Sequence, residues 1–146
     1  MKMDSQKANS LNYSEIQVGA IYSFERTLTR DDVKNFAQLT GDFNPLHFDP
    51  ESARKSQFKS NIVHGMLAGS LFSTLLGMHC PGRNSVYLSQ TLQFRKPIYP
   101  GDPLTIQGTV VSKSDSTRIV TIKTEILTEN QVAVTGEAKT LLPEEA

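Results

Sequence analysis

The sequence predicts an α+β fold in which a curved antiparallel β-sheet wraps around one long, buried α-helix. A run from residue 64 to about residue 79 places apolar groups nearly all round a helix, so we expect that helix to be buried on every side. After it come three alternating segments, 104–112, 117–128 and 131–142, joined by short polar junctions that favour antiparallel pairing. Because consecutive strands joined in this way cannot be parallel neighbours, a doubly wound fold is disfavoured.

Shorter elements precede the buried helix. Residues 20–29 alternate imperfectly between apolar and polar and predict a strand. Thr29 with Asp32 three residues later is typical of a capping box, and the helix that it starts should stop at Gly41. The segment 42–47 fits neither a helix nor a strand pattern, so we expect a loop there.

Two further elements complete the order along the chain. Asp49 followed by Pro50 predicts the start of a second short helix, since proline suits the first helical position. Residues 85–96 predict one strand with four apolar residues on a single face. Those residues are Val86, Leu88, Leu92 and Phe94.

Composition excludes several classes of protein. The 146 residues carry 15 Lys and Arg against 15 Asp and Glu, so a nucleic-acid partner is not expected. The single cysteine, Cys80, cannot form an internal disulfide, and with three histidines it gives no zinc-like spacing, so no metal is expected. Neither Cys80 nor the neighbouring His79 has an evident catalytic partner.

The chain is interpreted as a polar N-terminal tail, residues 1–13, followed by a single domain, residues 14–146. The tail lacks the continuous apolar core of a secretory signal. The most apolar stretch, 66–78, is well short of the ~20 residues that a membrane helix requires. We therefore expect a cytoplasmic protein without a membrane partner, although a cleaved organelle presequence is not excluded.

The first candidate for chemistry is the pair Asp42 and His47. In a loop bent at Pro45 both side chains can converge on one small molecule, and an imidazole beside a carboxylate can bind and deprotonate water. The structural alternative is that Asp42 caps a turn while His47 fills a half-buried niche. Spacing by itself leaves both interpretations open.

The second candidate is the start of the buried helix, His64 and Gly65. A helix N-terminus presents unpaired N–H groups and a positive dipole end, so the Gly65 N–H could hold a developing oxyanion. The alternative is simply a tight start to a buried helix. Ser70 and Ser73 lie within the same helix, where each needs a hydrogen-bond partner, either a carbonyl of the preceding turn or the site loop.

These candidates occur within segments that resemble a known family. The segments read LTGDFNPLH at 39–47, IVHGML at 62–67, YLSQ at 87–90, FRKP at 94–97 and VTGEA at 134–138. Together they are similar to the MaoC-like, R-specific enoyl-CoA hydratases, above all the short bacterial enzymes that feed polyhydroxyalkanoate synthesis. The likeness covers nearly everything after the N-terminal tail.

The resemblance implies a hot-dog fold and a homodimer whose active sites lie near the subunit interface. It implies that Asp42 and His47 are catalytic, that Gly65 supplies the oxyanion N–H, and that Ser73 supports the site. Asn44 and His64 stand in the same motifs and are expected to support it too. The substrates would be a trans-2-enoyl-CoA and an (R)-3-hydroxyacyl-CoA, with no cofactor, because the thioester itself acidifies Cα.

Three other functions stay open. A 3-hydroxyacyl-[acyl carrier protein] dehydratase of fatty acid synthesis shares the chemistry and differs in its acidic carrier. Arg95 and Lys96 could meet either such a carrier or the phosphates of CoA. A hot-dog acyl-CoA thioesterase and a non-enzymatic acyl-binding module are both disfavoured by the intact pair of Asp42 and His47.

Overall fold

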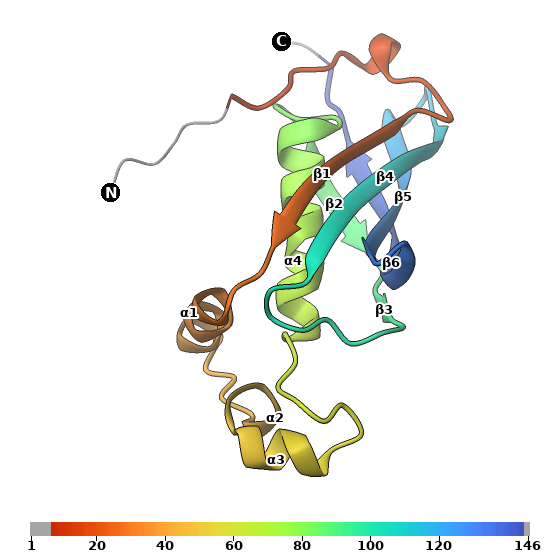
Figure 1. Cartoon of the computed structure of the whole chain (residues 1–146). Helices are drawn as coiled ribbons and strands as arrows, with labels where there is room; N and C mark the ends of the chain where they lie inside the picture. Colours follow the sequence, from red (N-terminus) through yellow and green to blue (C-terminus); the bar gives the residue numbers. More distant parts are fainter. Residues whose placement is uncertain (1–6, 145–146) are drawn as a thin grey trace.

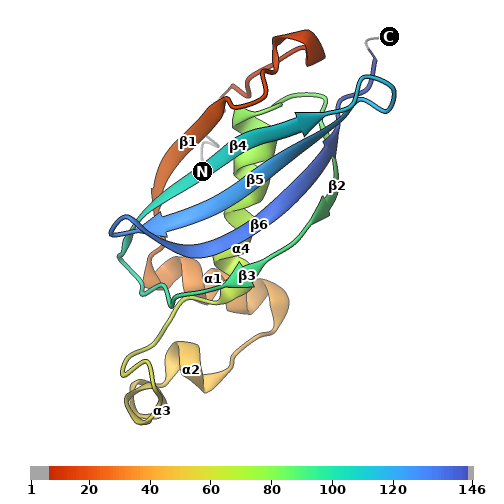
Figure 2. The ribbon, with the colours of Figure 1, turned by 90° about the vertical axis from the view of Figure 1, so that its right-hand side faces the viewer.

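One six-stranded antiparallel sheet is the framework of the computed structural model, which describes residues 7–144. The strand order is β1-β4-β5-β6-β2, and the short β3 also pairs with β6 (Figure 2). All pairs are antiparallel, which for β4, β5 and β6 confirms what their short polar junctions predicted. The strands are β1 (Ile21–Thr27), β2 (Val86–Gln90), β3 (Gln93–Phe94), β4 (Pro103–Lys113), β5 (Ile119–Thr128) and β6 (Gln131–Leu141).

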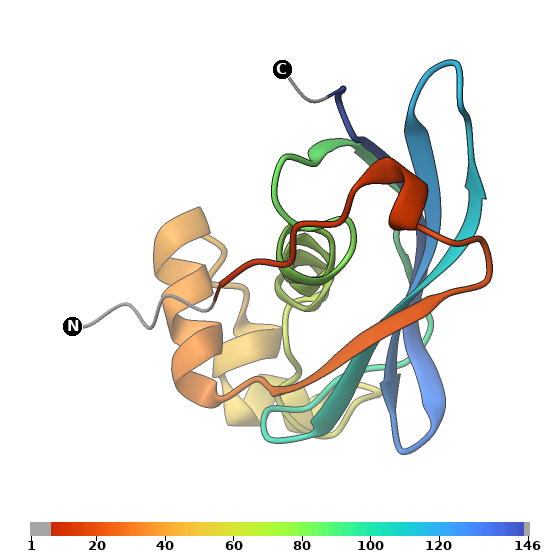
Figure 3. The ribbon, with the colours of Figure 1, turned by 90° about the horizontal axis from the view of Figure 1, so that it is seen from above.

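The sheet curves around one central helix (Figures 1 and 3). This helix, α4 (Gly65–Thr74), continues into a π-helical stretch, η2 (Leu75–His79), so together they span the predicted range. Phe72 and Leu75 are fully buried against sheet residues such as Ile106. The predicted architecture, a curved antiparallel sheet wrapped around a long helix, is therefore confirmed.

The prediction that this helix is buried on every side is wrong within a single chain. Four residues at helical spacing are exposed and form a stripe on the face turned away from the sheet. They are Met66, Ser70, Ser73 and Gly77. A curved sheet covers only one side of a helix, so the opposite side needs another partner. Across the described residues, no helix is long and apolar enough to cross a membrane.

Three short helices gather near the start of α4 (Figure 1). The first, α1 (Arg30–Thr40), has the predicted capping box of Thr29 and Asp32 and ends at Gly41, whose φ of 84° is left-handed. The third, α3 (Pro50–Lys55), begins after Asp49 as predicted. Between them the expected loop is only partly a loop, because α2 (Pro45–Phe48) forms one helical turn.

The strand predicted over residues 85–96 is two strands, β2 and β3, with a break between them. Gly136 of β6 explains the close approach at this break, because a Cβ there would lie 1.8 Å from the carbonyl oxygen of Thr91. Only Leu92 of the predicted apolar face packs against the core. Its companions are about half exposed: Val86 at 47%, Leu88 at 48% and Phe94 at 52%.

The N-terminal segment joins the domain earlier than residue 14. The N–H of Asn9 donates to the carbonyl of Met78 at 2.9 Å, and Ser10 forms an isolated β-bridge with Gly82. A short 3-10 turn, η1 (Tyr13–Glu15), follows, and Ile16 after it is fully buried. The described part of the predicted tail therefore packs on the far end of the central helix.

Candidate active site

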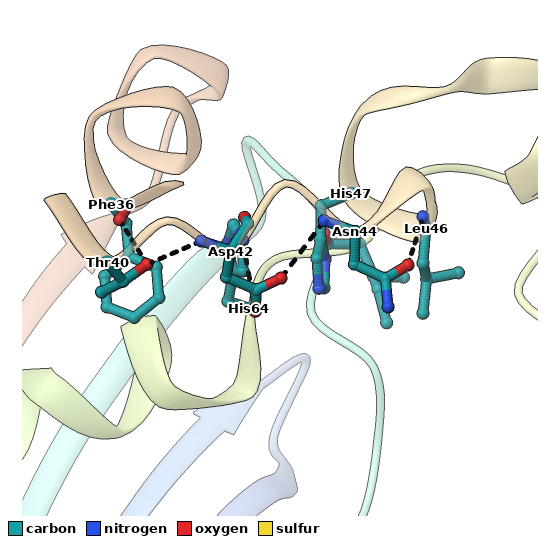
Figure 4. A network of polar contacts seen from close by, with 8 residues as sticks. Phe36, Thr40, Asp42, Asn44, Leu46, His47 and His64 are labelled. Atoms are coloured by element: carbon teal, nitrogen blue, oxygen red, sulfur yellow. Dashed lines mark hydrogen bonds and ion pairs between the residues drawn. The ribbon is translucent and has the colours of Figure 1, made fainter. Parts of the chain in front are cut away.

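Asp42 follows directly on the left-handed turn that ends α1. Its N–H donates to Thr40 Oγ1 at 3.3 Å, and its Oδ1 accepts the N–H of Asn44 at 3.2 Å. The carboxylate remains about half exposed, at 51%. Two turn contacts thus fix the backbone while a carboxylate oxygen stays available to a ligand (Figure 4).

His47 sits on the single turn of α2. Asn44 caps that turn, since its Oδ1 accepts the N–H of Leu46 at 3.0 Å, and Pro45 occupies the first helical position. His47 Nδ1 lies 2.7 Å from the carbonyl oxygen of Ile62. A carbonyl only accepts, so Nδ1 carries a proton, and in the neutral form of the ring the lone pair is then on Nε2.

The start of α4 brings His64 and Gly65 to the same place. His64 is the N-cap residue, is 2% exposed, and donates from Nε2 to the main-chain oxygen of Asp42 at 3.0 Å. Its ring stacks on that of His47, with centroids 3.8 Å apart. Gly65 is the first helical residue, so its N–H has no partner within the helix.

A cavity of about 530 Å³ contains these groups. Asp42, His47 and Gly65 all line it, and its walls include apolar side chains such as Met66 and Phe94. A site of this size suits a small-molecule ligand. Arg95 and Lys96 line it too, as do Gln57, Phe58, Ile62, Val63, His64, Ala68, Pro97, Ile98 and Val134.

Two predicted supporting residues lie outside this lining. Asn44 acts through the backbone, as the cap of α2. Ser73 is on the exposed stripe of α4, more than two turns from Gly65, and does not line the cavity of its own chain. Ser70, its neighbour on that stripe, donates to the carbonyl of Leu67 at 2.6 Å, which is the bond to the preceding turn that we considered.

Asn61, which lies outside the cavity lining, supports the site and was missed by sequence reasoning. Its Nδ2 donates to the carbonyl of Leu46 at 2.8 Å and to that of Asp49 at 3.1 Å, so it fastens α2 to the segment that leads into α4. Asp49 itself caps α3, and hydrogen bonds from Ser52 and then Glu51 lower the pKa of its carboxyl group. Asn61 lies in a segment without periodicity, so nothing in the sequence pointed to it.

A metal is the remaining chemical question at this site. Of the residues described, Asp42, His47 and His64 form the one group of three with donor atoms close enough for a metal ion, within 4.8 Å. His64 Nε2, however, carries the proton that it donates to the Asp42 carbonyl, so that nitrogen has no free lone pair in this arrangement. The geometry therefore suits acid–base chemistry better than coordination.

A curved antiparallel sheet around one helix, with a carboxylate, an imidazole and the first residue of that helix lining one cavity, fits the class of enzymes that work by acid–base catalysis. The model of the family described as MaoC like domain matches residues 14–131. This chain belongs to that family.

Individual relatives agree with this assignment. The chain is 41% identical over 134 residues to an (R)-specific enoyl-CoA hydratase of Aeromonas caviae, covering 91% of this chain and 100% of that protein. It is 39% identical over 132 residues to a mitochondrial 3-hydroxyacyl-[acyl-carrier-protein] dehydratase of Arabidopsis thaliana, covering 88% and 78%. A solved (R)-hydratase of A. caviae involved in PHA biosynthesis superposes with a TM-score of 0.84 at 43% identity, covering 88% and 98%.

Proposed function

We propose that this protein is an R-specific enoyl-CoA hydratase, which reversibly adds water to a trans-2-enoyl-CoA and yields an (R)-3-hydroxyacyl-CoA. The observation that carries the proposal is the convergence of the Asp42 carboxylate and the His47 Nε2 lone pair in one cavity. Gly65, whose N–H is at the positive end of α4, lines the same cavity.

The mechanism uses one water molecule held between Asp42 and His47. Its oxygen bonds to Cβ of the substrate as the pair takes one proton from the water, and that proton is delivered to Cα on the same face, which gives syn addition. Negative charge that moves onto the thioester oxygen is stabilised by the Gly65 N–H. Because the thioester already acidifies Cα, the proposed reaction needs no cofactor or metal.

A hydration assay tests this proposal. The purified chain is mixed with crotonyl-CoA and longer trans-2-enoyl-CoAs, the loss of enoyl absorbance is followed, and the product is analysed for chirality. We expect hydration to the R product, unaffected by EDTA. An S product, or hydrolysis of the thioester without hydration, would contradict the proposal. The A. caviae relative is described as involved in PHA biosynthesis. We propose the same use for this protein, with its (R)-3-hydroxyacyl-CoA product as the monomer.

The closest alternative is dehydration of a 3-hydroxyacyl group carried by acyl carrier protein. The Arabidopsis relative supports it, because it matches nearly the same span at similar identity. The two functions share Asp42, His47 and Gly65 and differ in the group that carries the acyl chain. Comparing kcat/KM for crotonyl-CoA and crotonyl-acyl carrier protein separates them, and we expect the CoA ester to be the better substrate.

We also propose that the protein is a homodimer. The edge of β2 opposite β6 has no strand beside it in the described chain, and Val86, Tyr87 and Leu88 on it are 39–48% exposed. The exposed stripe of α4, which includes Ser73, lies on the face that the sheet leaves uncovered. A symmetric contact that pairs the two β2 edges would give hydrogen-bond partners to the backbone N–H and C=O groups of each edge strand. It would also cover the apolar side chains on β2.

Light scattering tests the dimer directly. The chain has a mass of 16.2 kDa, so we expect a particle of about twice that mass at assay concentrations. Leu88→Lys should shift the mass toward the monomer, whereas Val111→Lys, at a 43% exposed position on β4, should not. A fully active wild-type monomer would rule the dimer out.

A further inference from the structure

His64 is a buried histidine with three aromatic rings packed near its own. Its ring stacks on His47 at 3.8 Å and contacts Phe36 at 4.9 Å and Phe48 at 5.9 Å between centroids. Only 2% of the residue is exposed. A leucine or phenylalanine would fill such a place without bringing a polar group into it, so the imidazole needs another explanation.

The two ring nitrogens have different surroundings. Nε2 lies 3.0 Å from the main-chain oxygen of Asp42 and must donate, since that oxygen only accepts. Nδ1 is buried and has no hydrogen-bond partner among the described residues. A proton on Nδ1 would have no acceptor, so the geometry favours the neutral ring in the single tautomer with Nε2–H. The Asp42 carboxylate, with Oδ2 at 4.0 Å from Nε2, is beyond hydrogen-bond reach.

The hydrogen bond from His64 Nε2 to the main-chain oxygen of Asp42 connects two parts of the site, the Asp42 loop and α4. The remaining hydrogen bonds of Asp42 join it to Thr40, the last residue of α1, and to Asn44, so both partners are close neighbours in the chain. The bond from His64 ties that loop to the first turn of α4, where Gly65 is the next residue. The carboxylate, the imidazole of His47 and the Gly65 N–H come from three separate segments, and His64 touches or adjoins all three.

We propose that His64 is a positioning residue, which fixes the Asp42 loop through its Nε2–H and the His47 ring through stacking. The inference rests on the proposed function, because it assigns how the acid–base pair is aligned with the oxyanion N–H. The reaction rate is sensitive to the alignment of the reacting groups, because a displacement of about 1 Å can lower it on the order of 100-fold. His64 would act on turnover more than on substrate binding.

Two substitutions separate the donor from the ring. His64→Phe keeps an aromatic ring beside His47, Phe36 and Phe48 but removes the donor and the unpartnered Nδ1. His64→Gln places an amide N–H near the position of Nε2 and removes the ring. For His64→Phe we expect a thermal midpoint equal to or above that of the wild type, kcat lower by roughly 10- to 100-fold, and KM within about threefold. His64→Gln should recover a clear part of the lost kcat.

Each outcome decides the inference. Wild-type kcat in His64→Phe, a rise in KM at unchanged kcat, or a His64→Gln variant no better than His64→Phe would overturn it. Phe36→Leu is the matched control, because it alters packing on the same ring without touching the hydrogen bond, and it should leave kcat near wild type.

Nitrogen-15 NMR of the wild-type protein tests the same bond without any substitution. We expect His64 to show a protonated Nε2 and an unprotonated Nδ1, and the opposite tautomer would overturn the inference. This measurement does not depend on the reaction. A wild-type protein that fails to hydrate enoyl-CoA but shows the expected tautomer therefore refutes the proposed function and not the geometry.

Discussion

The Nδ1 atom of His47 lies 2.7 Å from the carbonyl oxygen of Ile62, fifteen residues further along the chain. This bond decides which nitrogen of the imidazole can act as a base, because it holds the proton on Nδ1. The acceptor is itself held in place, since the N–H of Val63 donates to the carbonyl of Ile98 at 2.8 Å. The orientation of His47 thus comes from a loop outside its own helix.

The acid–base pair gives the first prediction. Asp42→Asn and His47→Gln should each lower kcat by about 10²–10⁴-fold, the range for loss of a general acid or base. The double variant should be little worse than either single one, because both groups act on one water. Steady-state hydration of crotonyl-CoA measures this, and circular dichroism should show an unchanged fold.

Matched controls exist for both substitutions. Asp31→Asn removes an exposed carboxylate from the first turn of α1, and His79→Gln removes an imidazole that stacks on Phe24 outside the cavity. Both should keep near-wild-type kcat. If the Asp42 and His47 variants also kept it, the proposed mechanism would be wrong.

The second prediction concerns the helix N-terminus. A Cβ at residue 65 would lie 2.9 Å from the nearest atom of the Phe94 ring, so Gly65→Ala must displace that ring and crowd the N–H. Removal of an oxyanion donor typically costs about 3–4 kcal/mol in the barrier, and we expect Gly65→Ala to lower kcat by at least tenfold.

The double variant Gly65→Ala/Phe94→Ala shows whether kcat falls because the Phe94 ring is displaced or because the N–H of residue 65 is crowded. It removes the clash with the ring but leaves the methyl group beside the N–H. We expect kcat to stay low, because the substrate oxygen cannot approach the N–H closely. Full recovery in the double variant would mean that the ring, and not the oxyanion contact, was responsible.

The third prediction distinguishes CoA from a carrier protein. Arg95 lines the cavity, where its one described side-chain hydrogen bond is to Gln93 at 3.1 Å, so its charge is available to a phosphate. Charge-assisted contacts are worth about 1.5–3 kcal/mol, so Arg95→Gln should raise KM for crotonyl-CoA by roughly tenfold or more at similar kcat. A crotonyl-pantetheine thioester, which lacks those phosphates, should hardly be affected.

Lys123→Gln is the control, since it neutralises a cation on β5 that does not line the cavity. It should leave KM unchanged for both substrates. Equal losses on CoA and pantetheine esters in Arg95→Gln would show that Arg95 has a structural role.

The fourth prediction is a pH dependence of stability. Burial raises the pKa of the Cys80 thiol from its ordinary value of 9.0 to about 11. The folded chain then keeps this proton more tightly than the unfolded chain, so the stability contribution is complete below pH 9 and is lost as the pH rises toward 11. Urea unfolding should show the difference in stability between the wild type and Cys80→Ala shrinking over that interval. A constant difference would contradict the assignment.

Local patterns in the sequence determined several helix ends, the pairing of three strands and the choice of candidate site residues. The capping box at Thr29 and the left-handed stop at Gly41 depend on neighbouring residues, so both were predicted. The alternation of β4, β5 and β6 and their short junctions fixed the antiparallel order for the same reason. Asp42, His47 and Gly65 were named as site residues because their residue types and motif context are informative.

Only the tertiary structure decided the contacts that join distant segments. Asn61 reaches α2 from beyond α3, and His64 reaches Asp42 across 22 residues, and no periodicity encodes either contact. The break at Leu92 and the exposed stripe with Ser73 likewise depend on how far one curved sheet can extend around a helix. Local propensity acts within a few residues, whereas the alignment of the candidate site residues depends on packing between elements, which a single sequence does not display.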